Sequence, residues 1–365
     1  MKKIELRKNR KQLSLNSPAA AAMAATIILA ALTLTACGEE KEKTPLKQGM
    51  DSIAAGDYAA AQNHFSDALS QGEAEKTVYR AMGLAAMASG DYDGAVKSFK
   101  DALACSNGIV DSMDIDINYY LAVAYYNQGK PDDAIGVYDA ILDMKSGEYN
   151  AYYMRGKVKL SQGNKAEAVA DYNKAVEIKK DDYDQYIRIC EDLKSAGYAA
   201  EGEGYIRTAM ESSSKLSQYQ QGVFNYYLGN YNDARNCLEN ARKDKDKSED
   251  LVLYLGRTYE SLGDAEYAIS LYEESIANGG ASAAIYLDMG LIRMRQNRYQ
   301  EAVDYFESGI SLGNGAYMQN LMYNKIVAYE YMGDFSTAKS LMAEYVQSYP
   351  GDEAAARENI FLSTR

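Results

Sequence analysis

The sequence predicts an all-α solenoid, a linear array of short helices packed in pairs. The first observation is a recurring motif: Gly56-Asp57-Tyr58 returns, in the same or a related form, at steps of 34, 39, 34, 34, 32, 34, 34 and 36 residues. A period of this length is typical of a repeat array. The second is that the 365 residues include only four prolines, so uninterrupted helices are possible through most of the chain. The later copies of the motif lie near Gly90, Gly129, Gly163, Gly197, Gly229, Gly263, Asn297 and Gly333.

The third observation is that small and large residues recur at fixed distances from each turn. Ala61 lies five residues after the turn glycine Gly56 and Phe65 follows four residues later, so the two share one face of the second helix. Gly49 lies seven residues before the same turn, and Gly83 occupies this place in the next copy. Glycine inside a helix costs about 1 kcal/mol relative to alanine. Its recurrence at this position therefore predicts close crossing of the two helices.

This pattern resembles the tetratricopeptide repeat family, whose unit of about 34 residues consists of two antiparallel helices. The resemblance covers residues 42–350 in nine copies, and it implies a right-handed superhelix with a concave inner groove. Residues 351–365 are expected to form a capping helix and tail. The expected repeats start near residues 42, 76, 115, 149, 183, 215, 249, 283 and 319.

Some copies depart from the pattern. The third begins late, so residues 106–114 are expected to form a longer loop. In the fifth, Tyr198 replaces the acidic turn residue and Gly202 and Gly204 weaken the second helix, so we expect the array to flex at residues 195–220. In six copies the residue after the turn can cap the second helix through its side-chain oxygen. These six residues are Asp57, Asp91, Asn164, Asn230, Asp264 and Asp334.

The N-terminal segment has the organisation of an export signal. A basic stretch, residues 1–17, is followed by an apolar stretch, residues 18–36, and then by polar residues. The boundary reads Leu34-Thr35-Ala36-Cys37 and resembles the lipobox of bacterial lipoproteins. That resemblance implies that residues 1–36 are removed, that Cys37 is lipidated, and that residues 37–41 form a short tether. The alternative is a transmembrane helix, because about 18 apolar residues nearly span a bilayer.

Under either interpretation the repeats lie outside the cytoplasm, tethered to a membrane. For a lipoprotein this is the outer face of the plasma membrane or the outer membrane, depending on the envelope type. Six of the 39 Lys and Arg residues but only one of the 52 Asp and Glu residues precede Cys37, which leaves a net charge of −18 on the rest of the chain. Such a surface repels nucleic acid and anionic lipid headgroups, so we expect neither as a partner of the repeats themselves.

The sequence offers little for catalysis. The only histidine, His64, has no Ser or Cys partner at a recognisable spacing, and one histidine does not make a metal site. Cys105, Cys190 and Cys237 are odd in number and fit no metal or redox motif, so we expect them to be buried or half-buried. We therefore predict a protein that is not an enzyme and has no cofactor or bound metal.

A binding groove has more support. In the resembling family the groove is lined chiefly by the first helices, and the positions ten, six and two to three residues before each turn give the inward-facing candidates. Tyrosine suits such a surface because it offers a large rigid ring with a polar tip. The alternative is that these tyrosines only pack between neighbouring first helices. The predicted partner-binding residues are Tyr119, Tyr126, Asn127, Tyr153, Lys157, Lys194, Tyr219, Tyr226, Tyr227, Arg257, Glu260, Tyr323 and Tyr331.

The sequence therefore predicts a membrane-anchored scaffold that binds a protein or peptide partner at the extracytoplasmic face of the cell envelope. The alternative function is a surface receptor for a glycan or cell-wall polymer, since tyrosine rings stack on sugars. The sequence does not predict the oligomeric state.

Overall fold

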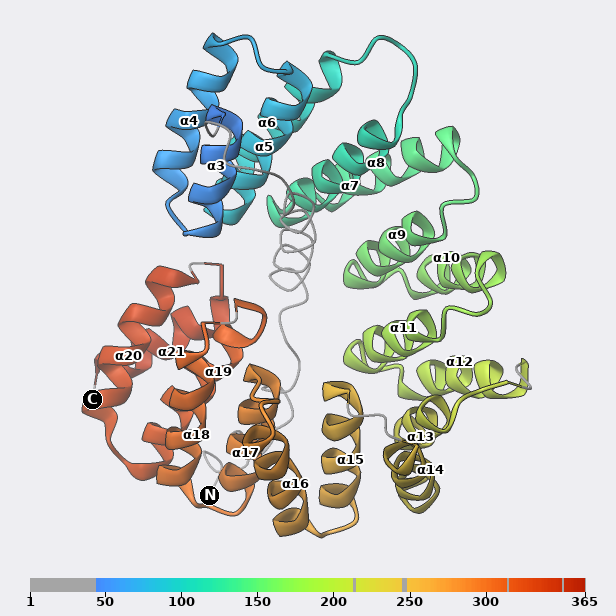
Figure 1. Cartoon of the computed structure of the whole chain (residues 1–365), viewed down its shortest axis with the longest axis vertical. Helices are drawn as coiled ribbons and strands as arrows, with labels where there is room; N and C mark the ends of the chain where they lie inside the picture. The colour runs from blue at the N-terminus through green and yellow to red at the C-terminus, as the bar shows by residue number, and fades with distance from the viewer. Residues whose placement is uncertain (1–43, 213–214, 245–247, 314, 350, 365) are drawn as a thin grey trace. The chain divides into compact units, whose positions relative to one another are not determined.

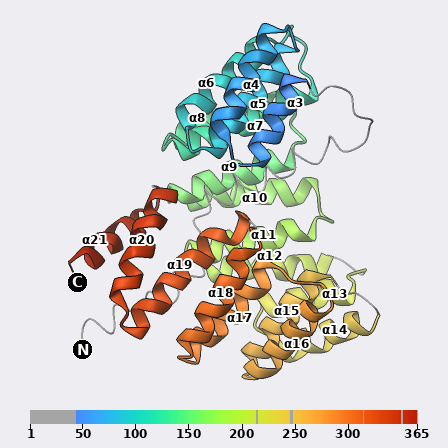
Figure 2. The same ribbon diagram turned by 60° about the vertical axis from the view of Figure 1, so that its left-hand side comes forward.

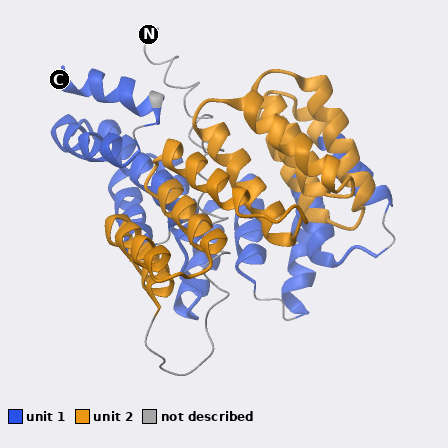
Figure 3. Cartoon of the chain, turned by 90° about the horizontal axis from the view of Figure 1, so that it is seen from above, with its two compact units in different colours: residues 1–18, 203–365 blue, residues 19–202 orange. Residues whose placement is uncertain are grey.

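The computed structural model describes residues 44–212, 215–244, 248–313, 315–349 and 351–364. Its described residues divide into two compact units, unit 2 with residues 44–202 and unit 1 with residues 203–364 (Figure 3). All the regular elements in these ranges are helices. None of these helices is both long and apolar enough to span a bilayer. The expected signal segment, Cys37 and the tether lie outside the described residues.

Unit 2 begins with the helices at the N-terminal end of the array (Figure 1). They are α3 (Pro45–Ala54), α4 (Tyr58–Ser70), α5 (Glu75–Ala88), α6 (Tyr92–Ala104), α7 (Ser112–Asn127), α8 (Pro131–Met144), α9 (Tyr149–Ser161), α10 (Lys165–Ile178) and α11 (Tyr183–Ser195). Helix α12 (Ala199–Ser212) follows, and the division between the units falls within it, after Gly202. This division lies inside the stretch where the sequence predicts flexing, which itself stays a prediction.

Unit 1 continues the same alternation of first and second helices (Figure 2). Its helices are α13 (Gln218–Tyr227), α14 (Tyr231–Lys243), α15 (Glu249–Ser261), α16 (Ala265–Ala277), α17 (Ala283–Arg295), α18 (Tyr299–Ser311), α19 (Gly315–Met332), α20 (Phe335–Ser348) and α21 (Glu353–Ser363). The described residues thus contain nine successive helix pairs and a final helix. Ala355 and Leu362 of α21 are buried against Met342 of α20, so this helix caps the last pair.

The recurring turn ends each first helix in the same way. At the first copy the amide of Asp57 donates to the carbonyl of Ser52, and the amide of Gly56 donates to that of Ile53. These two bonds are a Schellman motif, which needs a left-handed residue after the helix. Gly56 has a φ of 76°, and in the eighth copy Asn297 takes this conformation with a φ of 61°. The motif that dominates the sequence is therefore a helix terminator.

The expected helix caps are only partly confirmed. The carboxylates of Asp57, Asp91, Asp264 and Asp334 each accept a hydrogen bond from a backbone amide in the first turn of the following helix. Asn164 and Asn230, by contrast, make no side-chain cap. The side-chain nitrogen Nδ2 of Asn230 donates instead to Oδ1 of Asn225, 3.2 Å away on the preceding helix.

The small residues of the first helices receive the large residues of the second helices. A β-carbon placed on Gly222 would lie 2.6 Å from Cγ of Leu238, and one on Gly156 would lie 2.9 Å from Cδ1 of Tyr172. Real β-carbons do not come this close, so only glycine permits the observed helix separation. The predicted close crossing is therefore confirmed at these positions.

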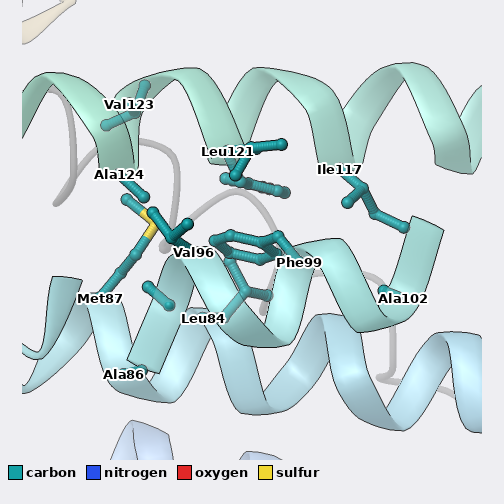
Figure 4. Packing of buried hydrophobic residues seen from close by; sticks show 12 residues of the cluster. Leu84, Ala86, Met87, Val96, Phe99, Ala102, Ile117, Leu121, Val123 and Ala124 are labelled. Atoms are coloured by element: carbon teal, nitrogen blue, oxygen red, sulfur yellow. The ribbon is translucent and has the colours of Figure 1, made fainter. Parts of the chain in front are cut away.

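Neighbouring pairs also share their cores, as Figure 4 shows for α5, α6 and α7. Phe99 of α6 is fully buried between Leu84 of α5 and Ile117 of α7. A helix pair of this kind cannot bury its apolar faces alone, so each pair depends on the next.

The loop between α6 and α7 is shorter than expected. The sequence predicts a loop over residues 106–114, but α7 begins at Ser112. Asp111 caps this helix, and Asp114 accepts in return from the backbone amide of Asp111. This reciprocal capping box allows the helix to start three residues earlier.

Candidate partner-binding site

Four tyrosines gather on the first helices of unit 1. The ring of Tyr226 lies 5.7 Å from that of Tyr227 and 5.6 Å from that of Tyr254, and Tyr219 lies 6.4 Å from Tyr254. The hydroxyls of Tyr227 and Tyr254 are 3.1 Å apart and share a hydrogen bond. All four side chains are half-buried. We call this group, Tyr219, Tyr226, Tyr227 and Tyr254, the tyrosine cluster.

Helix geometry explains how the cluster forms. Tyr219, Tyr226 and Tyr227 lie seven and eight residues apart, so they lie on the same side of α13. The helix is held at its start by a capping box between Ser217 and Gln220. Helix α15 packs beside it and supplies Tyr254.

An arginine borders the cluster. Arg257 lies one turn after Tyr254, and its guanidinium carbon is 5.8 Å from the Tyr254 ring. Its Nε lies 2.6 Å from Oδ2 of Asp288 on α17, and its Nη2 lies 3.3 Å from Oδ1. Burial opposes the charge of Arg257, but the Asp288 carboxylate outweighs it and raises the pKa of the guanidinium well above its ordinary value. The arginine therefore stays charged and is held in place.

Two polar groups at this site keep free hydrogen-bonding capacity. The hydroxyl of Tyr226 and Nη1 of Arg257 have no hydrogen-bond partner among the residues that the structure describes. Burial raises the pKa of Tyr226, so its hydroxyl is a neutral donor at physiological pH. The Arg257 side chain is 31% exposed, whereas its partner Asp288 is 12% exposed. The site thus offers donors beside aromatic surface.

The corresponding candidates in unit 2 are arranged differently. Tyr153 is buried, and its hydroxyl donates to Oδ2 of Asp192 on α11 at 2.9 Å. Nζ of Lys157 lies 3.0 Å from Oδ1 of the same carboxylate. Burial, reinforced by the Asp192 charge, raises the pKa of Tyr153. These two predicted site residues therefore share the Asp192 carboxylate, and their polar groups are already engaged within unit 2.

The other unit 2 candidates have different surroundings from one another. Tyr119 is half-buried and its hydroxyl donates to Glu148 at 3.3 Å. Tyr126 is half-buried against the core of α7, α8 and α9. The side-chain amide nitrogen of Asn127 is buried without a hydrogen-bond partner among the described residues. Lys194 is exposed and forms no ion pair within these residues.

The remaining unit 1 candidates contact other side chains. Glu260 accepts from Nε of Arg295 at 2.5 Å. Tyr331 stacks on Tyr299, with ring centroids 5.2 Å apart, and Tyr323 lies 5.6 Å from Tyr345. The structure therefore brings together Tyr219, Tyr226, Tyr227 and Arg257 out of the predicted set. A binding role stays a prediction for every one of the thirteen residues.

Sequence reasoning missed Tyr254 and Asp288. Tyr254 lies nine residues before its turn, one position away from the ten that we counted, and the tenth position holds the buried Leu253. Its spacing of three residues from Arg257 places both on one helix face and could have revealed it. No local signal marks Asp288, because its partner comes from a different helix.

One cysteine differs from expectation. Cys190 is buried and Cys237 is half-buried, as predicted, but Cys105 is exposed. It is the first residue after α6 and therefore follows the buried face of that helix instead of lying on it. Among the described residues no group of His, Cys, Asp and Glu side chains is placed to hold a metal ion.

Comparison with known protein families identifies the same repeated helix pairs. The family model described as tetratricopeptide repeat matches residues 46–108, 119–183, 225–283 and 255–317, and a second model of that description matches residues 321–352. The chain is a member of the tetratricopeptide repeat family. Proteins built from these repeats generally act as non-catalytic scaffolds that bind protein or peptide partners. The repeats of this chain therefore provide a scaffold for protein–protein interaction.

The chain is also similar to proteins of known structure. Yeast Tom70 is 14% identical, with 99% of this chain and 74% of that chain covered and a TM-score of 0.53. A tetratricopeptide repeat protein from Parabacteroides merdae ATCC 43184 is 17% identical, with 76% and 97% covered and a TM-score of 0.43. YrrB, described as having an unusual peptide-binding site, is 15% identical, with 46% and 84% covered and a TM-score of 0.35. No curated protein sequence matched the chain.

Proposed function

We propose that this protein is a lipid-anchored scaffold that holds an extended protein segment against the tyrosine cluster of unit 1, at the extracytoplasmic face of a bacterial membrane. The observation that carries the proposal is the juxtaposition of half-buried tyrosine rings with two free donors, the Tyr226 hydroxyl and Nη1 of Arg257. Tyrosine and arginine at the edge of an apolar surface are the residues that most often dominate protein interfaces.

The chemistry of the site favours an extended segment over an isolated anion. The bidentate contact with Asp288 neutralises Arg257, so the site does not present a net positive charge. Its donors match backbone carbonyl oxygens, and the rings match apolar or aromatic side chains of the bound segment. We therefore expect the partner segment to carry apolar residues and no cluster of acidic groups.

The proposed location depends on the N-terminal sequence. Leu34-Thr35-Ala36-Cys37 ends an apolar stretch preceded by basic residues, which supports export and lipidation at Cys37. Several acyl chains on one terminus would hold the protein stably where one would not. The anchor would lie in the outer face of the plasma membrane or in the outer membrane.

A glycan or cell-wall polymer is the alternative ligand. Sugar stacking needs free ring faces, but the ring plane of Tyr226 lies at 86° to that of Tyr227 and at 68° to that of Tyr254. These rings therefore pack edge to face and cover part of each other's surface. This packing favours a protein segment over a sugar chain.

The anchor is tested by expressing the full-length chain and its Cys37→Ser variant in a bacterium. We expect the N-terminal peptide of the wild type to begin at Cys37 with attached acyl chains in mass spectrometry. The variant should keep residues 1–36. An unmodified Cys37 in a chain that retains its apolar segment would favour a transmembrane anchor and contradict the lipoprotein assignment.

The binding role is tested by affinity capture from solubilised membranes and by sedimentation with purified cell wall. We expect Tyr226→Ala and Arg257→Ala to lose at least about 10-fold of the captured partner relative to wild type, the loss expected of central interface residues. Asn236→Ala, an exposed change on the second helix α14, is the matched control. Equal capture by all variants would contradict the site, and sedimentation with wall that depends on Tyr226 would establish the glycan alternative.

A further inference from the structure

The exposed apolar residues of unit 2 are concentrated at one type of position. Among its described residues the large hydrophobic side chains that are exposed are Ile109, Val110, Met144 and Ile178, with exposed fractions of 74%, 52%, 41% and 42%. Each lies in, or is the last helical residue before, a loop that joins the second helix of one pair to the first helix of the next. We call the four loops, residues 71–74, 105–111, 145–148 and 179–182, the loop edge of unit 2.

Side-chain contacts link these loops to the starts of neighbouring helices. Nζ of Lys76, at the start of α5, lies 3.0 Å from Oδ2 of Asp111 in the next loop and 2.7 Å from Oδ1 of Asp114. The hydroxyl of Tyr119 on α7 donates to Glu148 in the loop between α8 and α9. The loops therefore lie on the same edge of unit 2, where first helices begin and second helices end (Figure 1).

The chain enters unit 2 at this same edge. Helix α3 starts at Pro45 with Thr44 as its cap, and the amide of Leu46 donates to Oε1 of Glu73 in the first loop at 3.1 Å. Cys37 precedes Thr44 by seven residues in the sequence. Seven residues span at most about 25 Å when fully extended. A lipid attached to Cys37 would therefore hold the start of the loop edge close to the membrane.

Residues around the apolar side chains suit a lipid–water interface. Lys145 follows Met144, and Lys179 and Lys180 follow Ile178. Nζ of Lys179 lies 5.0 Å from the ring of Tyr149, which begins α9. Lysine and tyrosine both place an apolar body beside acyl chains and a polar tip in the headgroup region.

The opposite edge of unit 2 has no comparable group of exposed apolar side chains among the described residues. Its turns between first and second helices contain no exposed large hydrophobic residue in the described part of the unit. Both edges hold charged residues, such as Asp57 and Asp91 here and Asp111 and Glu148 on the loop edge, so the edges differ in their exposed apolar residues. The two edges thus differ in the way expected of a body that faces lipid on one side.

We propose that the loop edge of unit 2 contacts the lipid surface, with Ile109 and Val110 entering the boundary between headgroups and acyl chains. This inference rests on the proposed membrane anchor at the N-terminus. Two apolar residues bind a membrane weakly alone, but beside an anchor they fix the orientation of unit 2. Helices α6 and α7, which meet at the loop with these two residues, would then have this end toward the membrane.

The chain contains no tryptophan, so one introduced tryptophan reports on its own position. The experiment uses full-length Ile109→Trp protein, purified from membranes and reconstituted into phosphatidylcholine vesicles with ordinary or brominated acyl chains. We expect its emission to shift to shorter wavelength and to be quenched by the brominated chains. Lys130→Trp, in the exposed turn on the opposite edge, should show neither effect. Val110→Trp repeats the test if Ile109→Trp loses helical content.

Vesicle flotation separates failure of this inference from failure of the anchor. If the protein floats but the tryptophan at position 109 or 110 is not quenched, the lipid-facing edge is wrong and the anchor stands. Equal quenching at positions 109 and 130 would also overturn it, because no edge would then be preferred. A protein that does not float would overturn both the anchor and this inference.

Discussion

Tyr153 and Tyr226 show how differently two predicted site residues can be used. Both lie on first helices close to a basic residue, Lys157 in unit 2 and Arg257 in unit 1. Tyr153 is buried and its hydroxyl donates to Asp192, whose carboxylate also forms an ion pair with Lys157. Tyr226 is half-buried among other tyrosines, and its hydroxyl has no hydrogen-bond partner among the described residues.

The difference comes from where the next helix places a carboxylate. Asp192 lies on α11 and reaches both the tyrosine hydroxyl and the lysine of α9. Asp288 pairs with Arg257 of α15 and accepts from the Tyr272 hydroxyl of α16. It makes no hydrogen bond with the Tyr226 hydroxyl of α13 within the described residues. The same residue types therefore stabilise the stack in unit 2 and form a candidate binding surface in unit 1.

The largest expected effect is on Tyr153. Truncation to Tyr153→Ala should destabilise unit 2 by about 3–4 kcal/mol, because it removes a buried ring and leaves Asp192 without one donor. Urea unfolding followed by circular dichroism measures the change. Tyr153→Phe, which keeps the ring, should cost only about 1 kcal/mol. A loss below 1 kcal/mol for the alanine variant would show that Tyr153 is not a packing residue.

Acid pH should also act on unit 2, at the start of α7. Burial raises the pKa of Asp114, but the amide of Asp111, together with Lys76 and Ser106, outweighs it and lowers the pKa to about 2. A carboxyl with a lowered pKa stabilises the fold above its ordinary pKa of 3.8, and this contribution is lost as the pH falls toward 2.

The magnitude of this contribution is about 2 kcal/mol at neutral pH. Asp114→Asn should therefore be less stable than wild type at pH 6 in urea unfolding, and the gap should close near pH 2. Parallel pH profiles of the two proteins would show that Asp114 gives no pH-dependent stability.

A smaller effect is expected at Asp192. Asp192→Asn removes the charge that holds Lys157 and weakens the acceptor for Tyr153, which should cost about 1–2 kcal/mol in urea unfolding. Asp143→Asn, an exposed change at the end of α8, should alter stability by less than about 0.5 kcal/mol. Equal effects of the two changes would contradict the shared role of Asp192.

The smallest effect is expected at Lys194, which is exposed and forms no ion pair within the described residues. Lys194→Ala should change the free energy of unfolding by less than about 0.5 kcal/mol. A larger loss in the same urea experiment would mean that this lysine takes part in the packing of unit 2 as Lys157 does.

The repeated parts of this molecule could be predicted from sequence because they depend on local geometry. Gly56 needs a left-handed backbone and Gly156 must admit Tyr172, and both demands recur at a fixed period. The pairing of Lys157 with Asp192 could not be predicted, since it joins different helix pairs and has no fixed spacing. For the same reason the sequence predicts that Tyr153 and Tyr226 face inward, but it does not predict which of the two hydroxyls is hydrogen-bonded to another helix.

Photo-cross-linking at position 226 tests the central claim most directly. A photoreactive benzoyl-phenylalanine replaces Tyr226 in the full-length chain, and irradiated cells are analysed for adducts by mass spectrometry. We predict one dominant protein adduct from position 226, and none from position 236 on the exposed face of α14. An absence of protein adducts at 226, or the same adducts at both positions, would contradict a partner-binding site at the tyrosine cluster.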